Sequence, residues 1–282
     1  MKKTLILQAP AKINICLWVK EKRSDGYHEI ASLMQTLTLS DTITLQDCRT
    51  EGIHIECDDP AVPKGAENLV HKAACLILER FNIPPSIIIR IEKRIPIAAG
   101  LAGGSTDAAA VMAGMVRMYE KMLPMVELMT LSQKIGSDVP FVMHGGLAIA
   151  SGRGENLSFH EPPKPSFFVV IAVPKKVSVS TKWAYENYAP GENSRKEELF
   201  NKIFPCYKKR DIESLKNLVF NDLESVTLQR YPEVQEIKET LLEDGNGVVL
   251  MSGSGPSVFG LFEDRSSAVK AASRLNQEKV NV

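Results

Sequence analysis

The feature that most constrains this chain is a loop of small residues that joins two stretches of regular structure. The loop, Pro96–Thr106, contains three glycines and three alanines. The stretch before it, Ile87–Ile91, is β-branched and predicts a strand, and Asp107–Met118 after it predicts a helix. A backbone with so few side chains lets a phosphate group approach, and a helix N-terminus supplies unpaired N–H groups and a favourable dipole.

The loop has an alternative explanation. It is also compatible with a tight strand-to-helix turn in which Ser105 or Thr106 caps the helix. It is not a P-loop, because no lysine follows the glycines, and it does not match G-x-G-x-x-G either. A second loop of this kind, Ser252–Ser257, lies between two predicted strands near the end of the sequence. Two such loops in one chain favour a polyphosphate ligand.

Periodicity predicts both strands and helices in this chain. Residues alternate between apolar and polar from Lys12 to Lys20, and further strands are predicted at Glu29–Leu39, Thr42–Leu45 and Ile53–Cys57. Short connections suggest that this opening is a largely antiparallel meander. Further elements are predicted along the rest of the chain: helices at Asn68–Phe81, Met125–Ile135, Lys196–Ile203, Ile212–Phe220, Val234–Glu243 and Ser267–Leu275, and strands at Phe167–Val173, Val248–Met251 and Val258–Phe262.

Length and charge narrow the class of protein. The chain has 282 residues, enough for one large or two ordinary domains, and the Gly-, Pro- and charge-rich segment Ser151–Pro165 is the expected boundary. Its 34 basic and 34 acidic residues balance, which argues against a nucleic-acid-binding surface as the main function.

No apolar run is long enough for a membrane span or a signal peptide, so a cytoplasmic location is expected. Five widely spaced cysteines support neither a disulfide scaffold nor a zinc site.

Several other residues could carry chemistry, although each has an ordinary structural explanation. Lys12 could be an edge-strand lysine that points to solvent, and Asp138 could cap a helix or a turn. Tyr27 and His28 follow a turn and could simply be exposed, and Trp183 and Tyr185 could pack in the core or on the surface.

Taken together, the chain resembles the GHMP kinases, the superfamily of galactose, homoserine, mevalonate and phosphomevalonate kinases. Their first motif corresponds to Pro10–Asn14, their phosphate loop to Pro96–Thr106, and their C-terminal glycine-rich loop to Ser252–Ser257. The motifs occur in the family's order, so the resemblance covers nearly the whole chain. It implies a two-domain α+β fold: a ribosomal-protein-like N-terminal domain, residues 1–157, and a ferredoxin-like C-terminal domain, residues 158–282.

The resemblance also implies an activity. Ala9–Asn14, Arg23–His28 and Gly136–Phe141 are similar to the branch of the superfamily that phosphorylates methylerythritol linked to cytidine diphosphate. The expected reaction transfers the γ-phosphoryl group of ATP to the tertiary 2-hydroxyl. In this comparison Asp138 matches the general base, and Lys12 matches the cation beside it.

The resemblance implies further site residues. The expected ATP-binding residues are Pro96, Ile97, Ala98, Ala99, Gly100, Leu101, Ala102, Gly103, Gly104, Ser105 and Thr106, with Asn68 on the nucleotide side. Mg²⁺ is expected with ATP, with Ser105 as its first candidate ligand and Thr106 as the next. The expected substrate-binding residues are Asn14, Tyr27, His28, Trp183 and Thr181, with Tyr27 stacking on the cytosine, His28 reading its edge and Trp183 forming the opposite wall.

One departure from the family pattern lies in the phosphate loop. Ala98, Ala99 and Ala102 stand where relatives often have glycine, and we expect altered nucleotide affinity at most if their φ angles are negative. The alternatives are another GHMP kinase, of the homoserine or mevalonate type, a non-catalytic sensor on the same fold, and an RNA-binding protein. The expected partner is a small molecule, with neither nucleic acid nor membrane, and the expected assembly is a monomer or a homodimer.

Overall fold

The computed structural model describes residues 3–191, 194–243 and 245–282, which form two compact units. The first contains the residues up to Lys12 together with Thr36–Ile97 and Ala102–Gly145, and the second contains Ile13–Gln35, Ala98–Leu101 and Gly146–Val282. The units therefore interleave along the sequence. The predicted domain boundary between residues 157 and 158 divides the chain by sequence rather than by contacts, and it stays a prediction.

Two long strands, β1 (Thr4–Lys22) and β2 (His28–Asp47), contribute residues to both units. The sequence pattern predicted two separate strands where β2 runs without a break. The polar pair Ser40 and Asp41 interrupts the apolar pattern, yet the backbone stays extended there. Asp41 is completely buried and its carboxylate accepts hydrogen bonds, so the strand can continue through a charged residue.

The sheet of the first unit differs from the predicted meander. β2 pairs with β4 (Ser86–Glu92) in an antiparallel manner, with Thr42 opposite Glu92. β3 (Gly52–Cys57) pairs with β4 in a parallel manner, with Gly52 opposite Ser86. The expectation of an antiparallel arrangement is therefore wrong for β3. The reason is the connection between β3 and β4, which contains a helix and so returns the chain in the same direction.

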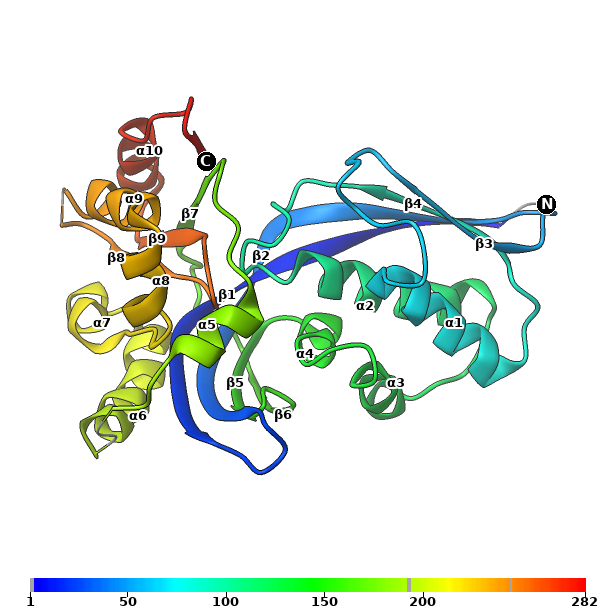
Figure 1. The fold of residues 1–282 in the computed structure, drawn as a ribbon, viewed down its shortest axis with the longest axis horizontal. Helices are drawn as coiled ribbons and strands as arrows, with labels where there is room; N and C mark the ends of the chain where they lie inside the picture. The colour runs from blue at the N-terminus through cyan, green and yellow to red at the C-terminus, as the bar shows by residue number, and fades with distance from the viewer. Residues whose placement is uncertain (1–2, 192–193, 244) are drawn as a thin grey trace. The chain divides into compact units, whose positions relative to one another are not determined.

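Helices α1 (Leu69–Phe81) and α2 (Gly103–Met118) pack against each other and against this sheet (Figure 1). A Cβ on Gly114 of α2 would lie 2.6 Å from Leu45 of β2, so a larger residue could not hold the helix so close. Two shorter helices complete the unit, α3 (Met125–Ser132) and α4 (Val139–His144). The buried core between the sheet and helices α1 and α2 includes Ile43, Leu45, Ile87, Ile89, Ile91, Ala73, Ile77, Val111, Met112 and Met115.

The second unit contains a hairpin that the sequence pattern did not predict. β5 (Leu147–Gly152) pairs with β2, with Ile30 opposite Gly152, and then with β6 (Asn156–His160). β6 lies inside the segment Ser151–Pro165 that had the composition of a linker. Its glycines and charges belong to the hairpin turn, where Gly152 and Gly154 have positive φ angles.

The rest of the second unit has the ferredoxin-like order. The repeating elements are β7 (Phe168–Pro174), α9 (Pro232–Leu242), β8 (Val248–Met251), β9 (Val258–Phe262), α10 (Arg265–Ser273) and β10 (Val280–Asn281). The antiparallel sheet has the order β10-β7-β9-β8, and α9 and α10 pack on it. This βαββαβ pattern confirms the predicted class. Between β7 and α9, the described residues form four helices: α5 (Thr181–Asn187), α6 (Ser194–Lys209), α7 (Ile212–Leu218) and α8 (Glu224–Arg230).

Candidate active site

The small-residue loop ends earlier than its composition predicted. Helix α2 begins at Gly103, so Ser105 and Thr106 lie in its first turn rather than at its cap. The N-cap position belongs to Ala102, whose side chain makes no capping hydrogen bond. The alternative in which Ser105 or Thr106 caps α2 is therefore wrong. The first N–H groups of a helix with no capping side chain are available to an anion.

The backbone conformation of two alanines in this loop also differs from expectation. Ala98 has φ = 52° and Ala102 has φ = 59°, both in the left-handed region that glycine occupies without strain. Ala99 is not among the described residues with positive φ. The sequence-based expectation for the three alanines assumed negative φ angles. That assumption holds at Ala99 and is wrong at Ala98 and Ala102.

Within the second unit, the two small-residue loops pack against each other. The Ser252 hydroxyl donates to the Gly100 carbonyl over 3.1 Å, and the Ser257 hydroxyl donates to the Ala99 carbonyl over 2.5 Å. A Cβ on Gly100, which has φ = 76°, would lie 2.2 Å from the Ser252 carbonyl oxygen. Glycine is required there, because any side chain would force the loops apart.

An ion pair joins the two residues expected to act on the acceptor. The Lys12 ammonium nitrogen on β1 lies 3.5 Å from a carboxylate oxygen of Asp138, which precedes α4. The side chain of Lys12 is 6% exposed and that of Asp138 is 39% exposed. Asp138 stands at the N-cap position but makes no capping hydrogen bond, and Lys12 does not point to solvent. The explanation of a solvent-facing lysine is therefore wrong. Asp138 does occupy an N-cap position, but its carboxylate makes no capping hydrogen bond there and is accessible to a ligand.

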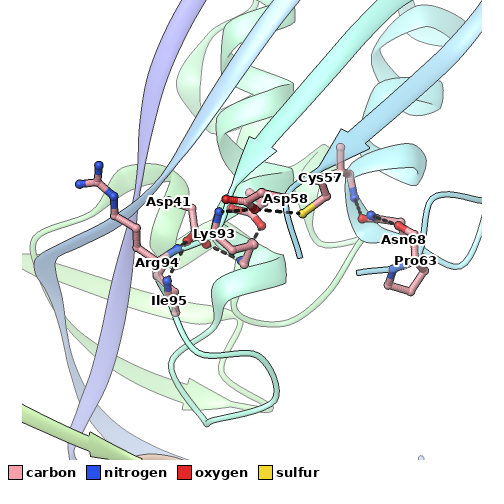
Figure 2. Close-up of polar contacts among 10 residues, drawn as sticks. Asp41, Cys57, Asp58, Pro63, Asn68, Lys93, Arg94 and Ile95 are labelled. Carbon is pink, nitrogen blue, oxygen red and sulfur yellow. Dashed lines mark hydrogen bonds and ion pairs between the residues drawn. The ribbon is translucent and has the colours of Figure 1, made fainter. Parts of the chain in front are cut away.

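A buried charge cluster in the first unit was not found from the sequence. The Lys93 ammonium group donates to the Asp41 carboxylate and, over 2.9 Å, to Asp107 of α2 (Figure 2 shows Lys93 beside Asp41). Burial alone would lower the pKa of Lys93, but the two carboxylates raise it above its ordinary value. Burial raises the pKa of Asp107 to about 7, against the opposing effect of Lys93. The only signal in the sequence was the interruption of an apolar strand at Asp41.

The first turn of α2 holds oxygen atoms that fit a hard cation. Ser105 is half-buried, and the hydroxyl of Thr106 is buried with no hydrogen-bond partner among the described residues. Hydroxyl oxygens beside nucleotide phosphates suit Mg²⁺. The residues expected to contact the metal are therefore compatible with it.

Asn68 caps helix α1 rather than standing free. Its side-chain oxygen accepts from the Val70 N–H over 2.8 Å, and its nitrogen donates to the Pro63 carbonyl (Figure 2). The residue after it, Leu69, would lie 3.8 Å from a Cβ on Gly104. The N-termini of α1 and α2 are therefore neighbours, and this agrees with a position of Asn68 near the phosphate loop.

In the second unit, two of the five residues expected to bind substrate contact the glycine-rich loop. The buried Asn14 donates from its side chain to Ser32 over 2.8 Å, and its backbone N–H donates to the Ser252 hydroxyl over 3.3 Å. The hydroxyl of Thr181 lies 3.0 Å from that of Ser254. Asn14 and Thr181 are thus both held against Ser252–Ser257.

His28 and Trp183 contact two different aromatic rings of this unit. The ring of His28 lies 5.7 Å from that of Tyr185, whereas Trp183 packs edge-on against Tyr231 at 5.8 Å. Tyr27 is 57% exposed, and the Arg153 guanidinium lies 5.0 Å from its ring centre. Burial, and then Lys22, lower the pKa of His28 below 6.5, which keeps the imidazole neutral at pH 7. The ring beside the predicted edge reader therefore belongs to Tyr185, two residues from the predicted wall Trp183.

Comparison with known proteins identifies the family to which this chain belongs. Residues 68–146 match the model of the GHMP kinases N-terminal domain, and residues 203–281 match that of the GHMP kinases C-terminal domain. The chain therefore belongs to the GHMP kinase family and has its two-domain fold.

The particular relatives narrow this class. A 4-diphosphocytidyl-2-C-methyl-D-erythritol kinase from Acetivibrio thermocellus is 42% identical over 98% of this chain and 96% of that protein. A protein of the same name from Geobacillus is 43% identical over 93% of this chain and 89% of its own length. The crystal structure of a 4-(cytidine 5'-diphospho)-2C-methyl-D-erythritol kinase superposes with a TM-score of 0.79 at 33% identity, and it covers 95% of this chain and 94% of that one.

A more distant structure shares the fold alone. Homoserine kinase from Cytophaga hutchinsonii superposes with a TM-score of 0.76 at 20% identity, covering 97% of this chain and 90% of its own. Among the described residues, no helix is both long enough and apolar enough to span a membrane.

Proposed function

We propose that this chain phosphorylates the 2-hydroxyl of 4-diphosphocytidyl-2-C-methyl-D-erythritol with ATP, giving the 2-phosphate and ADP. The observation that carries the proposal is the ion pair between Lys12 and Asp138, which joins a buried cation to an accessible carboxylate. Relatives that carry this enzyme's name at 42% and 43% identity support the choice of substrate. The step belongs to the formation of isoprenoid precursors without mevalonate.

The ion pair suits the chemistry of a tertiary alcohol. Such a hydroxyl does not ionise at neutral pH, so its proton must leave as the phosphoryl group arrives. The carboxylate of Asp138 accepts that proton in our proposal. Lys12 holds the carboxylate in place and offsets the negative charge that gathers between acceptor and phosphate. Phosphoryl transfer otherwise depends on positioning, which the two loops provide.

The phosphates of ATP are proposed to bind the loop Pro96–Thr106 and the uncapped start of α2. Backbone N–H groups and the dipole of a 16-residue helix attract them. Asn68 is proposed to lie on the nucleotide side. Ser105, and then Thr106, would hold Mg²⁺, which neutralises phosphate charge when it is bound with ATP.

The second unit is proposed to bind the cytidyl group. A cytosine needs aromatic faces for stacking and polar atoms for its edge. Tyr27 and His28 supply one face and the edge contact. Trp183 stays a candidate for the opposite wall, and the contact between His28 and Tyr185 adds Tyr185 as a second candidate. Asn14 and Thr181 are proposed to contact the substrate beside the glycine-rich loop. We also propose that the enzyme acts in the cytoplasm as a monomer or a homodimer.

A panel of acceptors tests the proposal. ADP release would be measured with the cytidyl alcohol, homoserine, mevalonate and galactose under the same conditions. We expect turnover with the cytidyl alcohol alone. Turnover with another alcohol would keep the roles proposed for Lys12 and Asp138 but contradict the proposed substrate. Binding of ATP with no turnover of any acceptor would overturn catalysis in favour of a sensor. Thermal protection by CDP would separately identify the cytidyl pocket.

A further inference from the structure

The cluster Asp41, Lys93 and Asp107 links the two ends of the phosphate loop. Asp41 lies in β2, Lys93 directly follows β4, and Asp107 lies in the first turns of α2. The exposed fractions of their side chains are 0%, 7% and 4%. Three ionisable groups this deeply buried depend on one another as hydrogen-bond partners, because water does not solvate them.

The entry to the loop is held by carboxylates. The backbone N–H groups of Arg94 and Ile95 donate to one oxygen of Asp41 over 2.6 and 2.8 Å, and that of Lys93 donates to Asp58 over 3.0 Å (Figure 2). Three consecutive N–H groups are thus satisfied by side chains just where the chain leaves β4. The backbone at the start of the loop is therefore fixed relative to β2.

The exit of the loop is held by the same lysine. The Lys93 ammonium group donates to the second oxygen of Asp41 and to Asp107 across a separation of 14 residues. Gly103, the first residue of α2, leaves room for this reach, because a Cβ there would lie 3.2 Å from the Lys93 nitrogen. The absence of a side chain at this position is therefore part of the same arrangement.

We propose that Lys93, with Asp41 and Asp107, positions the start of α2 and thereby prepares the phosphate loop for ATP. The proposal rests on the proposed function, since it assumes that the loop binds nucleotide. None of the three side chains needs to touch the ligand, so they are positioning residues. Without the link between Lys93 and Asp107, the start of α2 would have to be ordered when ATP binds, and affinity would fall.

Asp107→Ala tests the link most cleanly. It cuts the connection to α2 but leaves Lys93 paired with Asp41, so no buried charge is stranded. We expect the Kd of a non-hydrolysable ATP analogue, and the KM for ATP, to rise about tenfold, with kcat and the KM of the acceptor changed less than threefold. Asp107→Asn keeps an oxygen that accepts from Lys93 and should restore affinity to within about threefold of the original. Asp107→Leu replaces the alanine variant if that variant does not fold.

Val111→Ala is the control, because it also removes buried atoms from α2 but lies outside the cluster. It should lower the Tm and leave the Kd unchanged. An unchanged Kd in Asp107→Ala, or equal losses in Asp107→Asn and Asp107→Ala, would overturn the proposal. An equal loss in Val111→Ala would also overturn it. If the original chain binds the analogue but phosphorylates no acceptor, the proposed function fails while the positioning role is still decided by these Kd values. If it does not bind the analogue, both fail.

Discussion

The ammonium group of Lys12 and the carboxylate of Asp138 lie 3.5 Å apart, although the two residues are 126 positions apart in the sequence. The lysine is buried and the aspartate is partly open to solvent. A buried cation of this kind orients its partner, and in the proposed function the open side of the carboxylate accepts the proton of the reacting hydroxyl. This asymmetry is what a general base beside an electrostatic partner requires.

The first prediction concerns this pair. Asp138→Asn and Lys12→Ala should each lower kcat at least a hundredfold, because each removes one proton-accepting or charge-stabilising group. Steady-state ADP release measures the effect. Lys202→Ala, which removes an exposed lysine paired with Glu198, is the control and should keep the original rate. A rate near the original in either site variant would exclude the role given to that residue.

The second prediction separates the two aromatic candidates for the cytosine wall. Tyr185→Ala should raise the KM for the cytidyl substrate about tenfold or more, since the ring beside His28 is lost, and Trp183→Ala should raise it less. Neither should change the KM for ATP. Tyr185→Phe retains the ring and is the matched control, with a KM close to the original. A larger rise of this KM in Trp183→Ala would identify Trp183 as the wall of the cytosine site. Equal changes in the KM values for the cytidyl substrate and for ATP would argue against a stacking slot.

The third prediction concerns strain in the phosphate loop. Ala102→Gly should stabilise the fold by up to about 1 kcal/mol, because alanine is strained at φ = 59° and glycine is not. Ala99→Gly is the comparison. Ala99 lacks a positive φ and is buried, so glycine there should lower the free energy of unfolding. Denaturant unfolding of both variants measures the difference, and a loss of stability in Ala102→Gly as large as in Ala99→Gly would contradict this account.

The fourth prediction concerns pH and stability. Hydrogen bonds from Ser266 and Ser267 lower the pKa of Asp264, at the N-cap of α10, to about 2. A carboxylate with a lowered folded-state pKa stabilises the fold above its ordinary pKa of 3.8, and this contribution is lost as the pH falls towards 2. Asp264→Ala should therefore lower the Tm at pH 7, and the difference from the original protein should shrink between pH 4 and pH 2.

The control for that titration is Asp264→Asn. Its amide oxygen can still accept from the Ser267 N–H, so it should retain part of the cap at every pH. Its Tm difference from Asp264→Ala should not change between pH 4 and pH 2. A constant difference between the original protein and Asp264→Ala over this range would contradict the lowered pKa.

Much of the fold was predictable because its signals are local. Apolar periodicity located α1, β4, β7, β8 and β9 to within a few residues. The errors have particular causes. Asp41 made one strand look like two, and the turn of the β5–β6 hairpin looked like a linker. The parallel pairing of β3 with β4 depends on where a crossover helix returns the chain, which strand patterns do not report.

The sequence by itself determined the family, the two loops and the identity of Lys12 and Asp138 as candidates, because these motifs are contiguous and their residue types are restricted by phosphate chemistry. Only the tertiary structure decided how deeply Lys12 is buried beside Asp138, that Tyr185 lies beside His28, and that Lys93 joins Asp41 to Asp107. The partners in these pairs come from different elements. In the ion pairs of Lys12 and Lys93, burial makes each charged group depend on its partner, and no local sequence pattern indicates which residue that partner is.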